Sequence, residues 1–208
     1  MKLLSIIILC VAVILTGCSL PAVKSEKIEA IPNKIKELDV VIWMGQLPTK
    51  FFVKDTDREA YSSNCRKSLL KQLPSIFHKN GILIKSIYID TSSTGLVKES
   101  RELLKNSNSP YLLLLTVRGY TTGTLKSKTD LWSMNFQADL FDTQMPKIVW
   151  KSHPSIGLDT NDFDQSTAFF SAQIINGLKK DGLIDLKTDS AVDQEGKIIR
   201  GFSHWQIN

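Results

Sequence analysis

The sequence predicts an α/β (α+β) sandwich, with a mixed four- to five-stranded sheet and about three helices in the order β-α-β-α-β-β-β-α. In the first half, apolar β-branched runs alternate with stretches of helical period, which is typical of strands joined by helical crossovers. In the second half, two strand-like runs follow one another across a short turn, and a third helical stretch comes last. The contents of hydrophobic residues, 42%, and of charged residues, 23%, are ordinary for a globular domain.

The first predicted strand is Leu38 to Trp43, and the first helix follows it. Thr56-Asp57-Arg58-Glu59 matches a capping box, so we expect the helix to begin there and to end at Asn80-Gly81. Pro74 lies inside this helix and is expected to kink or divide its last part. Residues at helical spacing form the expected buried face: Tyr61, Cys65, Leu69, Leu73 and Ile76.

The middle of the chain supplies the centre of the sheet. A strand over Ile82 to Ile89 is followed by a short helix over residues 96–104, which stops before Pro110. Tyr111 to Tyr120 begins with a continuous apolar run, which indicates a central strand covered on both faces. Asp130 to Phe141 alternates instead, so we expect one buried face and one face in water. The predicted wet face carries Ser133, Asn135, Gln137 and Asp139.

The last predicted elements are a strand over Lys147 to Ser152 and a helix capped by Asn161 or Asp162. Gly182 closes this helix, and the residues at helical spacing on its buried face are Phe163, Phe170, Ile174 and Leu178. Residues 183–208 are predicted to be a C-terminal tail with a short hairpin around Glu195-Gly196.

The chain opens with a secretory signal. After Met1-Lys2, the apolar run from Leu3 to Leu15 has about 13 residues, whereas a helix that spans a bilayer needs about 20. Leu15-Thr16-Gly17-Cys18 follows, and this stretch resembles the lipobox of bacterial lipoproteins. The resemblance implies cleavage between Gly17 and Cys18 and lipid attachment to Cys18. An uncleaved membrane anchor and an ordinary signal peptide cut near Ala22 are the alternatives.

The lipoprotein resemblance also implies a location. Cys18 would carry a diacylglyceryl group and an acylated amine, and three acyl chains such as palmitate anchor a protein stably. Ser19, in place of the aspartate that retains such proteins at the inner membrane, implies the outer membrane, or the cell membrane in an organism without one. Cys10 leaves with the signal, so Cys65 has no partner for an internal disulfide. We expect Cys65 to be a core residue rather than a reactive thiol, because it lies on an apolar helical face.

These observations divide the chain into four parts. Residues 1–17 are the signal peptide, and residues 18–37 are the lipidated cysteine with a flexible, proline-containing tether. Residues 38–182 form a single α/β domain, and residues 183–208 are the tail.

Two stretches of the predicted sheet resemble small periplasmic α/β domains. Ser109 to Gly119 is similar to their ADYLLVGTV strand. Ala138 to Asp142 with Lys147 to Lys151 is similar to their xLxDxxTGxVVW hairpin, with Gln144-Met145-Pro146 in place of Thr-Gly. The families are those of the curli secretion lipoprotein, the lipoprotein activator of penicillin-binding proteins and the amino-terminal domain of the Tol translocation protein. The resemblance implies a scaffold or regulator that binds other proteins, without catalytic residues.

The residues show no catalytic signature. The net charge of +5 is not gathered in a Lys/Arg stripe, which argues against a nucleic-acid partner. His78, His153 and His204 are isolated, so we expect neither a metal nor a cofactor. Asp159 to Asp164 is interpreted as an acidic helix N-terminus rather than a calcium loop. The candidate partner contacts are Phe51, Phe52 and Trp205, with packing onto the core as the alternative.

The sequence therefore predicts a non-enzymatic, membrane-anchored lipoprotein of the cell envelope. Its domain would face the periplasm and bind or position another envelope component. The expected partners are the membrane, through the lipid, and an envelope protein. A small enzyme that acts on cell wall or lipid, and a carrier of lipid or of a small ligand, are the alternatives.

Overall fold

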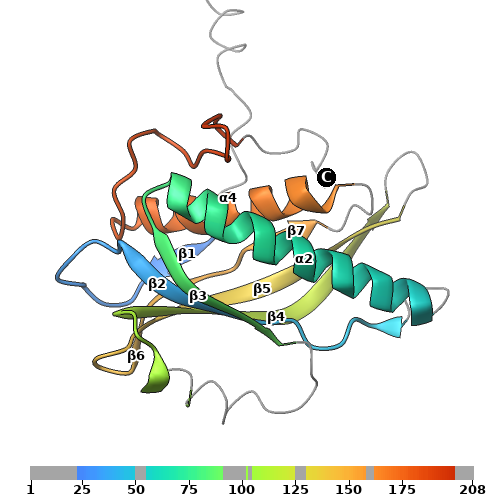
Figure 1. Cartoon of the computed structure of the whole chain (residues 1–208), viewed down its shortest axis with the longest axis horizontal. Helices are drawn as coiled ribbons and strands as arrows, with labels where there is room; N and C mark the ends of the chain where they lie inside the picture. The colour runs from blue at the N-terminus through green and yellow to red at the C-terminus, as the bar shows by residue number, and fades with distance from the viewer. Residues whose placement is uncertain are drawn as a thin grey trace, which may run out of the picture. The chain divides into compact units, whose positions relative to one another are not determined.

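The computed structural model describes residues 23–49, 55–90, 102, 105–124, 130–157 and 162–199. Residues 23–199 form one compact unit, and both ends of the chain, 1–22 and 200–208, lie outside the described residues. Within the unit, two helices cover one face of a mixed sheet (Figure 1). The predicted α/β sandwich is confirmed.

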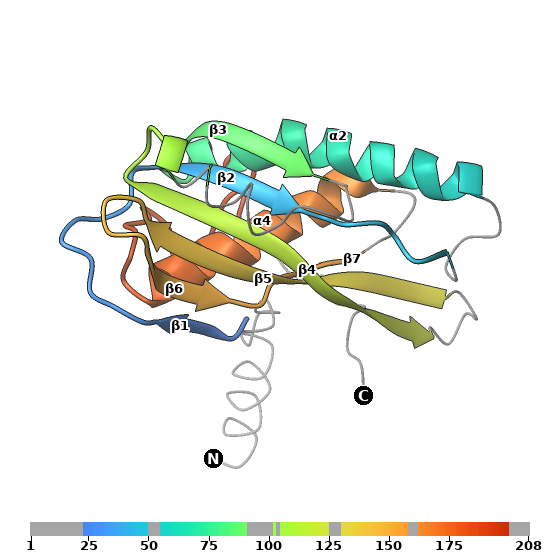
Figure 2. The ribbon, with the colours of Figure 1, turned by 90° about the horizontal axis from the view of Figure 1, so that it is seen from below.

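Seven strands form the sheet in the order β1-β6-β5-β4-β2-β3, and β7 pairs with β5 beside this path. Their bounds are β1 Ser25–Lys27, β2 Glu37–Trp43, β3 Leu83–Asp90, β4 Tyr111–Thr124, β5 Asp130–Asp142, β6 Lys147–Ser152 and β7 Ser155–Gly157. β2 is parallel to β3 and β4, and the other pairs are antiparallel. β1 and β3 are the two edges of the sheet (Figure 2).

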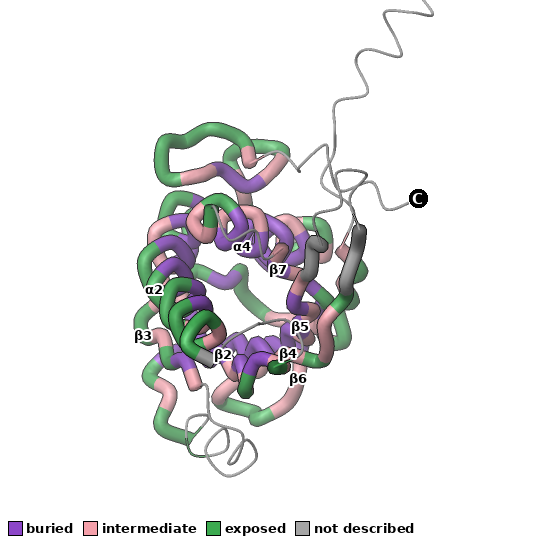
Figure 3. Tube along the Cα trace, turned by 90° about the vertical axis from the view of Figure 1, so that its right-hand side faces the viewer, coloured by how far each residue is buried: buried purple, intermediate pink, exposed green. Residues whose placement is uncertain are grey.

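The helices α2 (Asp55–Lys79) and α4 (Phe163–Lys180) contact each other along the same face of the sheet. Their buried positions face the strands, and their exposed positions face outward (Figure 3). Asp162 caps α4, and its side chain accepts a hydrogen bond from the backbone N–H of Gln165 at 2.8 Å. Gly182 ends α4 with a φ of 72°, a left-handed conformation that favours glycine.

The core lies between the helices and the sheet. Trp150 of β6, Phe136 of β5 and Phe77 of α2 are fully buried there, and the rings of Phe136 and Phe170 lie 4.9 Å apart. The predicted buried face of the first helix is confirmed, because its five residues are at most 5% exposed: Tyr61, Cys65, Leu69, Leu73 and Ile76. The predicted face of the last helix is confirmed for Phe170, Ile174 and Leu178, whereas Phe163, the first residue of α4, is only partly buried because it lies at the end of the helix.

All five predicted strands are present, with boundaries that differ by a few residues, and the continuous apolar run does form a central strand. The predicted number of strands is too low, because β1 and β7 have three residues each and no apolar run. Such short strands form where a paired neighbour offers its free backbone groups, which no local pattern encodes.

Two details of the first helix differ from the prediction. The helix begins at Asp55, so Thr56 lies inside the first turn instead of capping it. Pro74 does not divide α2, which runs unbroken to Lys79. Proline removes the one N–H that would bond to the carbonyl of Leu70, and Leu70 is 40% exposed, so that water reaches this side of the helix. The predicted helix over residues 96–104 lies almost wholly outside the described residues.

Both segments that flank the predicted domain pack onto it, so the domain is longer than residues 38–182. In the expected tether, Ser25 to Lys27 form β1, and Ile35 is 2% exposed. In the expected tail, Val192 exchanges two hydrogen bonds with the Asn80 amide, at 2.8 and 2.9 Å. The predicted hairpin around Gly196 is confirmed by an antiparallel bridge between Val192 and Ile198. Tertiary contacts order these segments although neither carries a sustained apolar run.

Candidate functional site

None of the residues singled out from the sequence as functional lies in the described part of the structure. Gly17 and Cys18 precede its first residue, Phe51 and Phe52 fall between residues 49 and 55, and Trp205 follows its last residue. Their assigned roles stay predictions. The described residues form two further surfaces of interest, a groove and the face of the sheet opposite the helices.

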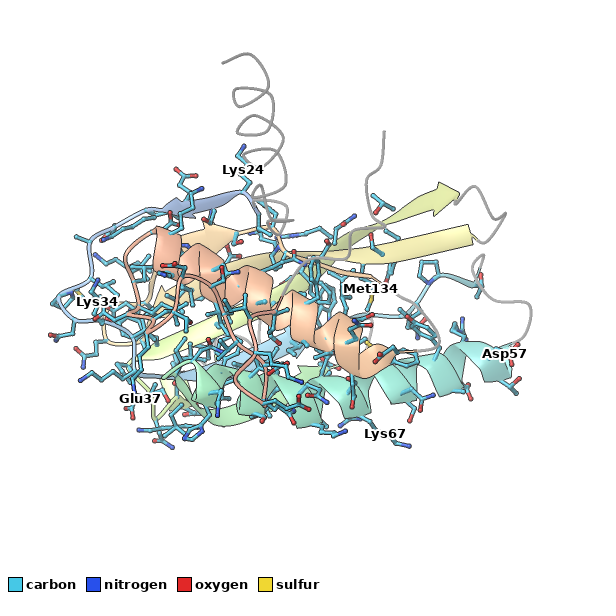
Figure 4. All side chains as sticks on the ribbon, turned by 90° about the horizontal axis from the view of Figure 1, so that it is seen from above. Lys24, Lys34, Glu37, Asp57, Lys67 and Met134 are labelled. Atoms are coloured by element: carbon cyan, nitrogen blue, oxygen red, sulfur yellow. The ribbon has the colours of Figure 1, made fainter. Side chains whose placement is uncertain are left out.

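The first of these is an open groove of about 590 Å³ at one end of the sheet. Its walls come from four separate segments: the chain before β2, the start of β4, the turn between β5 and β6, and the chain after α4. The lining residues are Pro32, Asn33, Lys34, Lys36, Glu37, Pro110, Tyr111, Asp142, Gln144 and Asp185. Lys34 and Glu37 mark this end of the molecule in Figure 4. A volume of this size suits a small ligand or a short peptide segment.

Most charges of the groove are held in place by other groups of the protein. Lys34 Nζ donates to the carbonyl of Gly182 at 2.7 Å and lies 3.5 Å from Asp185. Glu37 forms an ion pair with Lys85 at 2.8 Å. Asp142 Oδ1 accepts hydrogen bonds from backbone N–H groups of the turn, including that of Gln144 at 2.9 Å. The groove therefore carries positive and negative side chains that other groups of the protein hold in place. Such an arrangement suits binding of a polar partner.

Tyr111 forms the buried floor of this groove. Burial, and after it the negative charge of Asp142, raise the pKa of the Tyr111 phenol above its ordinary value. The phenol is protonated at neutral pH and is available as a hydrogen-bond donor.

The second surface is the face of the sheet opposite the helices. Val41, Leu112 and Leu114 form a buried apolar cluster there, with Phe141 packed against it. Asp39 lies on the same face and is 5% exposed. Its two carboxylate oxygens accept hydrogen bonds from Ser86 at 2.8 Å and from Ser107 at 2.6 Å.

These hydroxyl groups decide the ionisation of Asp39. Burial opposes the charged form, but the hydrogen bonds from Ser107 and Ser86 outweigh it and hold the pKa of Asp39 below its ordinary value. The carboxylate is thus ionised at neutral pH and engaged by neutral donors. We interpret Asp39 as a structural residue, because both of its carboxylate oxygens already accept hydrogen bonds.

A second carboxylate on this face, Asp139, corrects the sequence prediction. It was expected on the wet side of β5, but it is only 6% exposed. Asp139 stands opposite Leu114 of β4 and Lys151 of β6, so side chains of both neighbouring strands flank it. Asp139 Oδ2 accepts a bond from Gln137 at 2.7 Å, and Gln137 accepts one from Arg118 at 2.9 Å. Within the described part of the chain, Oδ1 of Asp139 has no hydrogen-bond partner.

The acidic stretch before α4 has the predicted structural role where it is described. Asp162 caps the helix, and Asp164 lies in its first turn. Asp164 accepts hydrogen bonds from Lys71 at 2.6 Å and from Ser68 at 2.8 Å, which join α4 to α2. The bond from Lys71 is the largest cause that lowers the pKa of Asp164.

Cys65 takes the core position expected from the sequence, and of the three histidines His78 and His153 are described, whereas His204 lies outside the described residues. Cys65 is fully buried, and burial raises the pKa of its thiol to about 12, so the thiolate is not populated at neutral pH. His78 lies exposed in the last turn of α2, and His153 is exposed after β6. Between residues 23 and 199, no described group of three or more His, Cys, Asp or Glu side chains could hold a metal ion.

The groove is the feature that sequence reasoning missed. Its lining residues come from four segments between Pro32 and Asp185 and follow no spacing pattern, so only the fold brings them together. None of the helices among the described residues is long and apolar enough to cross a membrane.

Comparison with known proteins finds similarity only among solved structures. No family model matches the chain, and no curated protein matches it either. A PelC dodecamer from Paraburkholderia phytofirmans aligns over 74% of this chain and 96% of its own, with 13% identity and a TM-score of 0.42. Lipoprotein GNA1162 from Neisseria meningitidis aligns over 61% and 85%, with 17% identity and a TM-score of 0.30. A minor lipoprotein from Acinetobacter baumannii aligns over 67% and 92%, with 18% identity and a TM-score of 0.28.

Proposed function

We propose that this chain is a lipid-anchored protein of the cell envelope that binds or positions another envelope component without catalysing a reaction. The observation that carries the proposal is the Leu15-Thr16-Gly17-Cys18 stretch directly after a short apolar segment. It supplies both an export signal and a lipid attachment site. The outer membrane, with the domain in the periplasm, is the proposed location.

The groove is the proposed binding site within the described domain. Lys36 is exposed and, unlike Lys34 and Glu37, forms no ion pair with any described residue, so it offers a positive charge to a partner. Charged and polar side chains line the groove together with Pro32, Pro110 and Tyr111, which favours a protein segment with both polar and apolar groups over a lipid tail. A carrier of apolar ligands would need an apolar cavity instead. Phe51, Phe52 and Trp205 are proposed as additional contacts.

Lipid attachment is tested with two cysteine variants and metabolic labelling by palmitate. Cys18→Ala should remove the label and leave an uncleaved or soluble chain. Cys10→Ala is the matched control, because it changes a cysteine of the signal and leaves the mature protein identical. Equal labelling of Cys18→Ala and the parent protein would refute the anchor.

Partner binding is tested in intact cells with a photoreactive residue at Lys36, and separately at Phe52 and Trp205. Lys67, exposed on α2 and far from the groove, is the control position. We expect one protein to crosslink from position 36 and to be lost when Lys34 is changed to Glu. Products that contain only lipid or glycan would contradict the proposal.

A further inference from the structure

We infer that the β1 edge of the sheet faces the membrane and contacts anionic lipid headgroups through Lys24 and Lys27. This inference rests on the proposed lipid attachment at Cys18. It adds an orientation: one defined edge of the domain, rather than any part of its surface, lies at the lipid.

The first argument is the length of chain between the lipid and the sheet. The chain is fixed to the domain from Lys24 onward, because the Lys24 carbonyl accepts the N–H of His153 at 3.3 Å and Ser25 pairs with Ser152. After β1, the N–H of Ile28 donates to the carbonyl of Val149 at 2.9 Å. Only six residue steps separate Cys18 from Lys24, and they span at most about 22 Å when fully extended.

The second argument is the width of the sheet. β1 and β3 are its opposite edges, and the strand order places five spacings between them (Figure 2). At about 4.8 Å per spacing, the two edges lie about 24 Å apart. If the β3 edge rested on the membrane, Lys24 would stand farther from the lipid than the chain reaches. Of the two edges of the sheet, only the β1 edge therefore lies within reach of the anchor.

The third argument is the chemistry of this edge. Lys24 and Lys27 are exposed, and neither forms an ion pair within the described part of the chain. Figure 4 shows Lys24 on the side of the domain opposite to α2. Lys67 and Asp57 lie on α2 itself. Two carboxylates lie near these lysines: Glu26 of β1 is exposed like them, and Glu29 is engaged by Lys147, so the edge keeps an excess of one positive charge. Unpaired lysines close to a membrane are attracted to anionic headgroups.

The orientation is tested with the full lipidated protein in vesicles that contain phosphatidylglycerol. A fluorescent dye is attached to Ile28→Cys near β1 or to Tyr88→Cys on β3; the parent residues are 43% and 47% exposed, so the two sites are matched. Cys65 is fully buried and stays unlabelled. With a quencher on the lipid headgroups, we expect several-fold stronger quenching at position 28. Equal quenching, or stronger quenching at position 88, would overturn the inference.

The contribution of charge is tested with Lys24→Glu/Lys27→Glu against Arg66→Glu/Lys67→Glu, two exposed positions on α2. The first pair should lower the quenching at position 28 toward the level in phosphatidylcholine vesicles, and the second pair should leave it unchanged. The same effect from both pairs would refute contact through Lys24 and Lys27.

Flotation with vesicles distinguishes a failure of lipid attachment from a failure of the proposed orientation. A protein that does not float contradicts lipid attachment itself. A protein that floats and is quenched equally at both positions contradicts only the orientation.

Discussion

Gly177 of α4 lies directly against the indole ring of Trp150 in β6. A Cβ atom built on Gly177 would lie 3.0 Å from Cζ2 of Trp150 and 3.4 Å from Cβ of Ser25 in β1. The indole is fully buried, and its Nε1 donates to the carboxylate of Asp181 at 2.8 Å. This contact sets how closely α4 approaches the β6–β1 edge of the sheet.

Gly177→Ala should destabilise the protein, although alanine is the better helix former by about 1 kcal/mol. The added methyl group meets a buried ring that cannot shift freely, and such overpacking costs about 1–3 kcal/mol. We expect a net loss of about 1 kcal/mol in the free energy of unfolding by denaturant. Trp150→Phe removes the atom in conflict, so in its background Gly177→Ala should cost less. Strict additivity of the two changes would contradict the contact.

Asp181→Ala should cost about 1–2 kcal/mol of stability, because it leaves the buried indole N–H of Trp150 without an acceptor. Asp181→Asn keeps an acceptor oxygen at the same place, and its loss should be clearly smaller. Thermal unfolding of both variants checks this, and the near-ultraviolet circular dichroism of Trp150 reports local change. An equal loss in both variants would point to the charge of Asp181 instead of the hydrogen bond.

Cys65 should not react with thiol reagents in the folded protein at neutral pH, because it is fully buried and its pKa is about 12. The alkylation rate in increasing denaturant should follow global unfolding. Cys65→Ser should destabilise by about 1–3 kcal/mol, since it buries a hydroxyl group in an apolar place. Cys65→Ala, the control, should cost about 1 kcal/mol. Rapid alkylation of the native protein would contradict the burial.

Asp39 should make stability depend on pH in the acid range. Its pKa is lowered in the folded state, so its contribution is fully present above the unfolded value of about 3.9 and is lost as pH falls through the lower folded value. Ser107→Ala removes a donor at 2.6 Å and should raise the pKa of Asp39 in a carboxyl NMR titration. Ser63→Ala, at an exposed position of α2, is the control. An unchanged titration of Asp39 in Ser107→Ala would refute the role of this hydroxyl.

Local patterns predicted the regular elements well, because their periods report directly on burial. The helical spacing from Tyr61 to Ile76 reflects the buried face of one helix, and the apolar run at Tyr111 reflects a buried strand. Both predictions were confirmed. The start of α2 was misplaced by two residues, and β1 and β7 were missed. These errors concern short or terminal segments, whose conformation depends on the strand or loop beside them.

The sequence by itself determined the α/β class, the predicted export and lipid signal at Cys18, and the buried place of Cys65, since each depends on residues close together in the chain. Only the tertiary structure decided the groove around Tyr111, the burial of Asp139 and the attachment of β1 to β6. These features join segments that are far apart in sequence, and their residues are polar or charged. Hydrophobic periodicity carries no information on which polar segments meet, so the pairing of strands has to be known first.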